Sequence, residues 1–494
     1  MAWDEWGRLD AVALAELVDK REVTPKQLAR QAAEAVELVN PKINAVLEVF
    51  DDVVEDPYKD GMSKGGPFHG VPMLIKDLDS AMKGRLQEQG SLLTKGVRAK
   101  QDSPLIQNFR LAGLNLIGRT ATPPFGYASS TESFINGITR NPWNLDYSPS
   151  GSSGGSAAAV ATGIIPIATG SDGAGSIRDP ATVCGLIGLK TTRGRLPLPC
   201  ETLGHELALH MTCEGVLTRT VRDTALALDY MSRHRLGDTF MPIPKPERPY
   251  IEEVKRDPGT LRIAMSVGGW GREKEAHPEA IARTRLVAEF LQSLGQRVEE
   301  VRDEDICDWE VMWGSAGLGW HALPKRWKDI SVATGVPISQ ENLEPTLYWA
   351  YQAAQKYTEF DVWHMQEVNA IITRRFGQFF EKYDLLLCPA TAVAYIKAGP
   401  GSGFSTLEKL ENGEQAFAWL ETLIDESRYF MLANETGTPA IAVPAGLGET
   451  KLPLGVQLYA PWCREDRLLQ MAAQLERARP EWFNQIPPVH VSKV

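Results

Sequence analysis

The chain has 494 residues, of which 43% are hydrophobic and 23% are charged, and its formal net charge is −11. This length and composition are typical of a globular protein with a large core. The acidic balance excludes a polyanion-binding protein, so no nucleic acid partner is expected.

The N-terminal region, residues 1–60, is predicted to be helical. Residues 11–39 repeat apolar side chains at helical spacing, and Thr24 and Pro25 suit the N-cap and the first helical position. The first residues, MAWDEW, carry acids where a signal peptide needs a basic start and an apolar run. The uncharged stretch between Asp146 and Asp172 is broken by Gly, Ser and Pro, so no membrane span is expected.

The cysteines are scattered. The six residues form no CxxC pair, so neither a disulfide framework nor a zinc site is expected. Together with the missing signal peptide, this composition predicts a cytoplasmic protein.

Residues 61–235 are predicted to form the core that carries the chemistry. The short apolar run VPMLIKD at 71–77 predicts a buried strand that carries Lys76. LAGLNLIGRTATPPFG at 111–126 predicts a helix end, a strand and a loop. Alternation of this kind indicates an α/β fold.

The second half of the chain continues the alternation. Residues 237–259, rich in proline and charge, predict a surface crossover, followed by a strand at 261–267 and a helix that ends at Gly295. Residues 303–430 are predicted to be mostly helical. The tryptophans between 309 and 363 fit either an aromatic core or the wall of an apolar substrate pocket. Strands are expected again at 384–391, 436–446 and 452–461.

Two groups of glycine-flanked serines lie on either side of one apolar segment: GSSGGS at 151–156 and GAGSIR at 173–178. A serine needs a base to become a nucleophile, and neighbouring glycines let backbone N–H groups converge on a developing oxyanion. The stretch therefore predicts acyl transfer. Neither group matches the GxSxG nucleophile elbow.

The base is not an obvious histidine, because none of the eight lies in a partner motif or a metal-ligand pair. A buried lysine is the alternative, since desolvation lowers the pKa of an ammonium group. Lys76 has such a setting, although it could also reach water at the strand end or pair with Asp77. An SxxK tetrapeptide, Ser80 to Lys83, lacks the SDN and KTG companions of penicillin-binding enzymes.

Three segments together resemble the amidase signature family of serine hydrolases: GVPMLIKDL at 70–78, GSSGGSAAAVATG at 151–163 and GSDGAGSIRDPATVCGLIGLKTTRGR at 170–195. NPWN at 141–144 and TGTPAIAVP at 436–444 extend the resemblance over the whole chain. It implies one domain, residues 1–494, built on a mixed, largely open twisted β-sheet with helices on both faces. It also implies a small-molecule amide as substrate and no cofactor or metal. Whether the chain forms a homodimer is left open.

The resemblance implies a Ser-cisSer-Lys triad. Ser176 is then the nucleophile, Ser152 the bridging serine with a cis peptide bond, and Lys76 the base. The implied oxyanion donors are the backbone N–H groups of one loop: Gly173, Ala174, Gly175 and Ser176. Residues implied to support this loop or the cis turn are Ser153, Asp172 and Arg178.

The chain departs from the commoner family motif GTDxGGS, with Ser171 for threonine and Ala174 for glycine. Alanine tolerates a positive φ less well than glycine, so a tighter loop is expected. The variant SDGAGSIR is most similar to the branch of the family that includes 6-aminohexanoate-cyclic-dimer hydrolases. That branch makes Tyr127 an expected substrate contact, and the tryptophan-rich segment adds Trp313 as an apolar wall.

The substrate is left open. A tyrosine at position 127 departs from the smaller polar residue of the cyclic-dimer branch, so aryl amides, linear amides, carbamates and esters remain alternatives. A different class of function is also open, in which the chain is an amidotransferase-like subunit or an inactive scaffold within a complex.

Overall fold

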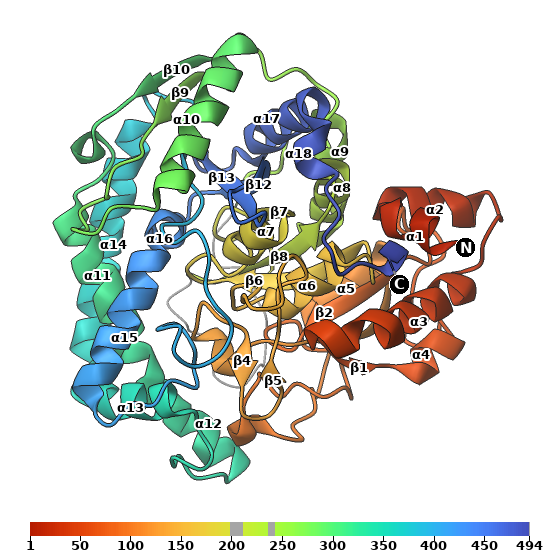
Figure 1. Ribbon diagram of the computed structural model, residues 1–494, viewed down its shortest axis with the longest axis horizontal. Coiled ribbons are helices and arrows are strands. Elements are labelled where there is room, and N and C mark those ends of the chain that lie inside the picture. Colours follow the sequence, from red (N-terminus) through yellow and green to blue (C-terminus); the bar gives the residue numbers. More distant parts are fainter. Residues whose placement is uncertain (198–210, 236–242, 494) are drawn as a thin grey trace.

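The computed structural model describes residues 1–197, 211–235 and 243–493 (Figure 1). These residues form one sheet of 11 strands, in the order β1-β3-β2-β6-β8-β7-β12-β13-β11-β9-β10, and a separate two-stranded ribbon, β4-β5. The strands are Val46–Val49 (β1), Pro72–Lys76 (β2), Asn115–Thr120 (β3), Glu132–Ser133 (β4), Gly137–Ile138 (β5), Ile167–Asp172 (β6), Ile187–Lys190 (β7), Cys213–Thr218 (β8), Arg262–Met265 (β9), Arg297–Glu300 (β10), Leu385–Pro389 (β11), Ala440–Leu447 (β12) and Pro453–Tyr459 (β13).

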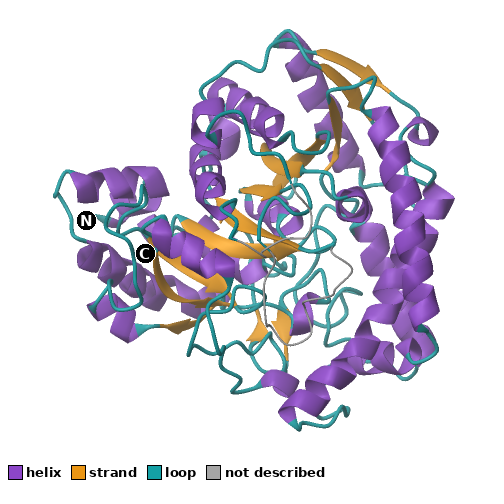
Figure 2. Cartoon of the chain, turned by 180° about the vertical axis from the view of Figure 1, so that it is seen from behind, coloured by secondary structure: helices purple, strands orange, loops and turns teal. Residues whose placement is uncertain are grey.

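Helices surround this sheet (Figures 1 and 2). They are Trp3–Arg8 (α1), Ala11–Asp19 (α2), Pro25–Ile43 (α3), Asp51–Glu55 (α4), Pro104–Leu111 (α5), Gly154–Ala161 (α6), Arg178–Cys184 (α7), Val221–Met231 (α8), Tyr250–Glu253 (α9), Pro278–Ser293 (α10), Trp309–Ala322 (α11), Trp327–Thr334 (α12), Pro345–Ala354 (α13), Glu359–Phe379 (α14), Gly413–Glu426 (α15), Arg428–Thr436 (α16), Glu465–Ala478 (α17) and Pro480–Phe483 (α18). The sheet is mixed, since β2 runs parallel to β3 and β6 whereas β6 and β8 are antiparallel. The predicted α/β fold with a mixed open sheet is confirmed.

The N-terminal helices form where the sequence predicts them. In α3, Pro25 is the first residue, and Thr24 caps the helix by accepting from the N–H of Gln27 at 3.2 Å. The Gln27 side chain accepts from the N–H of Thr24 at 2.8 Å, which completes a capping box. The apolar faces of α2 and α3 then pack into the main core.

The centre of the sheet is buried on both faces. All residues of β2 are buried, because it lies between β3 and β6, and this confirms the strand predicted at 71–77. Strands β9, β11, β12 and β13 confirm the other predicted runs. Helix α6 is buried along its whole length. It can approach the sheet because Gly155 has no side chain: a Cβ there would lie 2.5 Å from the backbone nitrogen of Ala121.

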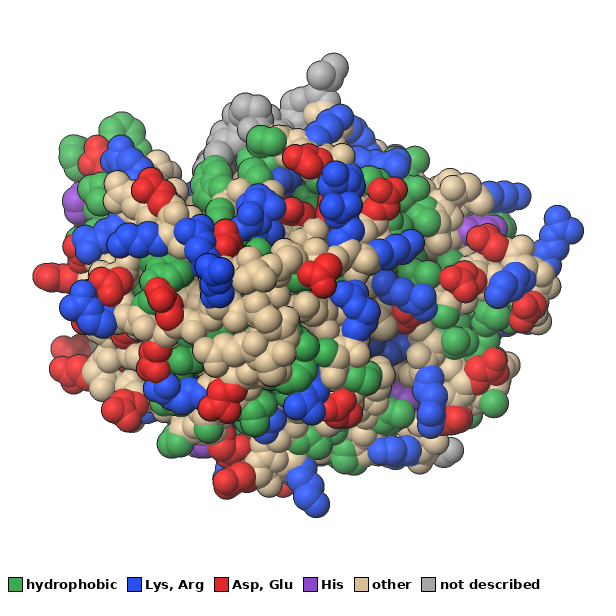
Figure 3. All heavy atoms as spheres, turned by 90° about the horizontal axis from the view of Figure 1, so that it is seen from above, with side chains coloured by type: hydrophobic (Ala, Val, Ile, Leu, Met, Phe, Trp, Pro, Cys, Tyr) green, Lys and Arg blue, Asp and Glu red, His purple; other side chains and the backbone are tan. Residues whose placement is uncertain are grey.

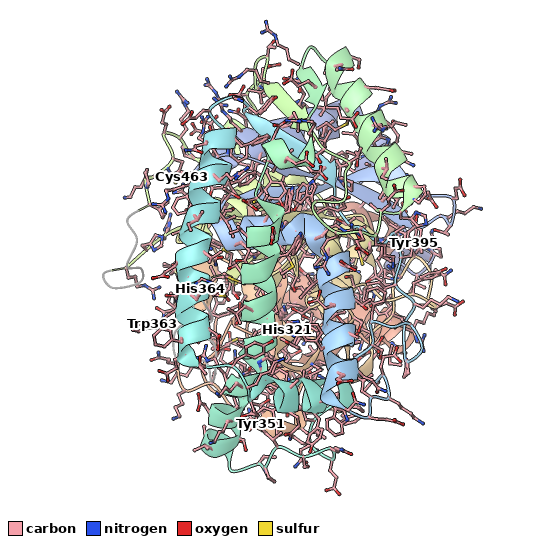
Figure 4. All side chains as sticks on the ribbon, turned by 90° about the vertical axis from the view of Figure 1, so that its left-hand side faces the viewer. His321, Tyr351, Trp363, His364, Tyr395 and Cys463 are labelled. Atoms are coloured by element: carbon pink, nitrogen blue, oxygen red, sulfur yellow. The ribbon has the colours of Figure 1, made fainter. Side chains whose placement is uncertain are left out.

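A second core cluster lies under the helices α11 to α16 and is rich in aromatic residues. Figure 4 shows α11, α14 and α15 side by side, with His321 among them. In this cluster Trp309 stacks on Trp270 with ring centroids 4.9 Å apart. The helical prediction for this region is confirmed, and part of its tryptophan content forms core, as one of the two interpretations expected.

The remaining predictions concern the surface and the cysteines. Residues 237–242 of the predicted crossover lie outside the described residues, as do Cys200, His205 and His210. The rest of the crossover, residues 243–259, is mostly exposed and includes the short helix α9. The five described cysteines form no disulfide. Among the described helices, none is long and apolar enough to cross a membrane. The face in Figure 3 interleaves basic and acidic side chains.

Candidate active site

The predicted triad residues come together at one edge of the sheet. Strands β2 and β6 are parallel neighbours, so their carboxyl ends meet at the same edge. Lys76 is the last residue of β2, and the turn that follows β6 carries Ser176. Ser152 lies in the loop before α6, and the Gly151–Ser152 peptide bond is cis, as the family resemblance implies.

The ammonium group of Lys76 is held by two serines. Its Nζ donates to Ser152 Oγ at 2.7 Å and to Ser171 Oγ at 2.9 Å. The side chain is buried, and this desolvation lowers the pKa of Lys76 to about 8, although nearby carboxylates oppose the shift. Lys76 is therefore substantially neutral in mildly alkaline solution. The contact with Ser171 was not predicted. The sequence shows that a serine replaces the family's threonine at this position, but it does not show which group the hydroxyl binds.

The alternative interpretations of Lys76 do not fit its surroundings. Only 1% of Lys76 is exposed, so the side chain does not reach water. Asp77 lies 3.1 Å from Nη1 of Arg119 and forms its ion pair there. The geometry therefore favours the interpretation of Lys76 as a desolvated lysine that can act as a base.

The SxxK tetrapeptide does not form a site. Ser80 Oγ donates to Oε1 of Glu214 at 2.6 Å, and both residues are buried. Lys83 is exposed. Burial raises the pKa of Glu214 to about 8. This carboxyl group is therefore mostly protonated below that pH and mostly ionised above it.

Ser153 connects the two serine segments. Its N–H donates to the backbone oxygen of Ser176 at 3.3 Å. Its hydroxyl lies 3.3 Å from both the backbone oxygen and the backbone nitrogen of Ser171. The support role implied for Ser153 therefore has a physical basis, because its contacts join the cis turn to the loop after β6.

The loop between β6 and α7 requires glycine at one position. Gly175 has φ of 123°, and a Cβ there would lie 2.7 Å from the Phe430 side chain. Ala174 does not adopt a positive φ, so the substitution for glycine is accommodated without that strain. The sterically restricted position expected at Ala174 is therefore Gly175.

The same loop presents backbone donors. The N–H of Gly175 donates to Oδ1 of Asp172 at 2.7 Å, which removes Gly175 from the predicted oxyanion donors. For the N–H groups of Gly173, Ala174 and Ser176, the described residues supply no acceptor. These three are the donors that remain for a substrate oxygen.

Asp172 and Arg178 form a fully buried, bidentate ion pair beneath this loop. Arg178 Nε lies 2.8 Å from Oδ2 of Asp172, and Nη2 lies 2.9 Å from Oδ1. Burial alone would raise the pKa of Asp172, but the charge and hydrogen bonds of Arg178 outweigh it and hold the value at about 2. The pair predicted from the motif is therefore an internal anchor of the loop.

Two residues that the sequence analysis missed complete this anchor. Asn434 of α16 accepts from Arg178 Nη2 at 2.7 Å, and Gln457 of β13 accepts from Nη1 at 2.6 Å. For Gln457 the signal available in the sequence was a single amide side chain within the otherwise apolar run LPLGVQLYAP, whereas Asn434 stands beside Glu435 and gives no such signal. An amide within an apolar run needs a buried partner.

We expect Arg178→Met to destabilise the fold by about 3–5 kcal/mol, because it leaves the Asp172 carboxylate buried and unpaired. Urea unfolding followed by circular dichroism measures this loss. The matched control is Arg285→Met, which breaks the surface pair with Glu300, in which both side chains are 46% exposed. That change should cost no more than about 1 kcal/mol. Equal losses for the two variants would contradict the anchor role.

Two cavities open beside Ser176. The Met431 cavity contains part of the loop after β6 and an apolar wall: Gly126, Tyr127, Ala128, Ser129, Gly151, Ala174, Gly175, Ser176, Asp179, Trp320, Leu420, Leu423, Ile424, Ser427 and Met431. The Arg326 cavity contains the two serines that bind Lys76, Ser152 and Ser171, and its full lining is Leu78, Asp79, Phe125, Gly126, Tyr127, Ser152, Ser171, Gly173, Ser176, Thr212, Trp320, Leu323, Arg326, Trp327 and Ile330. Ser176 thus lies where the two cavities meet.

Of the two predicted substrate contacts, only Tyr127 lines these cavities. Its ring lies 5.8 Å from that of Trp320 and 5.3 Å from that of Trp327. Trp313 lies outside both cavities, because its indole N–H donates to the backbone oxygen of Trp270 at 2.6 Å and its ring packs there. The prediction for Trp313 is corrected to Trp320 and Trp327, which form the aromatic wall.

Asp179 is a further buried polar residue that the motif analysis did not single out. It lines the Met431 cavity and accepts a hydrogen bond from Ser150, which precedes the cis turn. Burial, and then the charge of Glu426, raise the pKa of Asp179 well above its usual range. Its contact with Ser150 ties α7 to the turn that positions Ser152.

Comparisons with known proteins agree with this geometry. The chain matches the family model described as Amidase over residues 27–469. It is 35% identical to a 6-aminohexanoate-cyclic-dimer hydrolase of Paenarthrobacter ureafaciens, over 97% of this chain and 96% of that protein. It is 32% identical to an acylamidase of Rhodococcus erythropolis, over 97% of each. The solved structure of a 6-aminohexanoate cyclic dimer hydrolase complexed with substrate superposes with a TM-score of 0.87, at 33% identity, over 98% of this chain and 99% of that one.

Proposed function

This chain belongs to the amidase signature family of hydrolases, which act on carbon–nitrogen bonds, and from that premise we propose that it cleaves small amides through an acyl-enzyme on Ser176. Ser152 and Lys76 form the proton relay. The observation that carries the proposal is the 2.7 Å contact between Lys76 Nζ and Ser152 Oγ, at a lysine whose pKa is lowered to about 8.

In the acylation step, Ser176 Oγ attacks the amide carbon. Its proton passes to Ser152 Oγ, whose own proton passes to the neutral amine of Lys76. The N–H groups of Gly173, Ala174 and Ser176 stabilise the oxyanion. The C–N bond then breaks as the relay returns a proton to the nitrogen, because an amide nitrogen leaves only when protonated. A water molecule activated by the same relay hydrolyses the ester and frees Ser176.

The relatives direct the choice of substrate. The cyclic-dimer hydrolases, at 35% identity, make 6-aminohexanoate cyclic dimer the first amide to test. Aryl amides are the second candidate, because Tyr127, Trp320 and Trp327 offer aromatic faces beside Ser176. Carbamates and esters belong to the same acyl-transfer chemistry.

A substrate panel tests the proposal on the isolated chain. We expect hydrolysis of at least one of four compounds: 6-aminohexanoate cyclic dimer, an acyl anilide, a primary alkyl amide and an aryl carbamate. A fluorophosphonate should label Ser176, which peptide mass mapping locates. Absence of both turnover and labelling in folded protein would overturn the proposal in favour of an amidotransferase-like subunit or a scaffold. Light scattering on the same sample tests for a homodimer.

A further inference from the structure

Arg326 is a half-buried cation for which the described part of the chain supplies no partner. It immediately precedes α12 and lines the Arg326 cavity together with Ser152 and Ser176. Among the described residues, none accepts a hydrogen bond from its guanidinium or forms an ion pair with it. Arg178, by contrast, is bound by an aspartate and two side-chain amides. A half-buried guanidinium without an acceptor in the described part of the chain is free to bind an anionic group of a ligand.

The relay decides which part of a substrate lies near Arg326. Ser152 must deliver a proton to the leaving nitrogen, and Ser152 lines the Arg326 cavity and not the Met431 cavity. The amine portion of the amide therefore occupies the Arg326 cavity. The acyl portion extends into the Met431 cavity, whose wall includes Leu420, Leu423 and Ile424.

We propose that Arg326 binds a carboxylate carried by the amine portion, so that the preferred substrates are amides whose leaving group is an amino acid. This inference rests on the proposed acyl-transfer function, which fixes the orientation. Arginine suits a carboxylate because its planar N–H groups match the two oxygens. Leu323, Trp327 and Ile330 line the same cavity and suit the methylene chain that joins the amine to the carboxylate.

An outer cavity continues from Arg326 toward the surface. It shares Leu323 and Arg326 with the inner one and reaches Trp363, which is 69% exposed on α14 and labelled in Figure 4. Its charged residues are three cations and two acids: Lys325, Arg326, Lys328, Asp329 and Glu359. Arg326 thus stands where an amino acid product would leave toward solvent.

The test compares leaving groups that share one acyl group. Hexanoyl amides of 6-aminohexanoate, 4-aminobutyrate and glycine are compared with the hexanoyl amide of hexylamine, which has no carboxylate. We expect kcat/KM to be about 10- to 100-fold higher for the best carboxylate substrate, as for a hydrogen-bonded ion pair. The best chain length reports the distance of Arg326 from the scissile bond. Added salt should reduce the preference.

Arg326→Met should reduce the preference to about one, and Arg326→Glu should favour the hexanoyl amide of 1,5-diaminopentane, whose free end is cationic. The matched control is Lys328→Met, because Lys328 lines only the outer cavity. Retention of the preference in Arg326→Met, or equal kcat/KM for all leaving groups in the unmodified protein, would overturn the inference while leaving the hydrolase intact. Hydrolysis of none of these amides or of the substrate panel would instead count against the proposed function.

Discussion

Replacement of Ser176 by alanine is expected to lower kcat by about 10⁴- to 10⁶-fold on any amide that the protein hydrolyses, because no acyl-enzyme can form without the proposed nucleophile. The half-buried position of Ser176 between the two cavities leaves it accessible to a substrate. Steady-state kinetics on the best substrate measure the loss. Fluorophosphonate labelling of the variant should disappear with it.

The control is Ser293→Ala, because Ser293 is an exposed serine at the end of α10 whose hydroxyl donates to the backbone oxygen of Phe290 at 2.6 Å. It should keep both activity and labelling. Ser176→Ala with near-normal turnover, and with circular dichroism that shows a folded protein, would assign the nucleophile elsewhere. Ser152→Ala provides a second comparison. It interrupts the relay and preserves the attacking oxygen, so slow labelling of Ser176 should remain.

The sequence was most informative where one local pattern carries both structure and chemistry. The apolar run 71–77 predicts a buried strand because Lys76 is its only interruption before the strand end, and burial of that lysine is what lowers its pKa. The glycines beside Ser152 and Ser176 likewise predict tight turns of the backbone. Each of these inferences depends on neighbours in the chain, and each agrees with the position found.

Features that depend on distant contacts were not predicted in the same way. Asn434 and Gln457 reach Arg178 from segments more than 250 residues away, and no local pattern indicates that meeting. The same limit applies to Trp313 and Trp320, which lie on the same helix. Trp313 packs against Trp270, whereas Trp320 lines the cavities beside Ser176, and this difference arises from tertiary packing. Family motifs therefore predict the proposed catalytic groups, whereas the lining of the cavities beside them depends on tertiary packing.

Replacement of Lys76 by alanine is expected to lower kcat/KM by about 10³- to 10⁴-fold, because it removes the proposed base that accepts the proton of Ser176 through Ser152. Lys76→Arg should recover little, since a guanidinium does not deprotonate at ordinary pH. The control is Lys83→Ala, an exposed lysine on the following loop, which should keep full activity. Rapid turnover by Lys76→Ala would refute the relay.

The pH profile distinguishes a base from a residue that only supports the fold. Burial lowers the pKa of Lys76 to about 8, and the reactive form is the neutral amine. In the unmodified protein, kcat/KM should therefore rise about tenfold per pH unit below pH 8 and level off above it. The residual activity of Lys76→Ala should lack this limb, whereas Lys83→Ala should keep it. A profile that is already flat from pH 5 to pH 9 would exclude lysine as the base, because an ammonium at pH 5 cannot accept the proton that Ser152 must release.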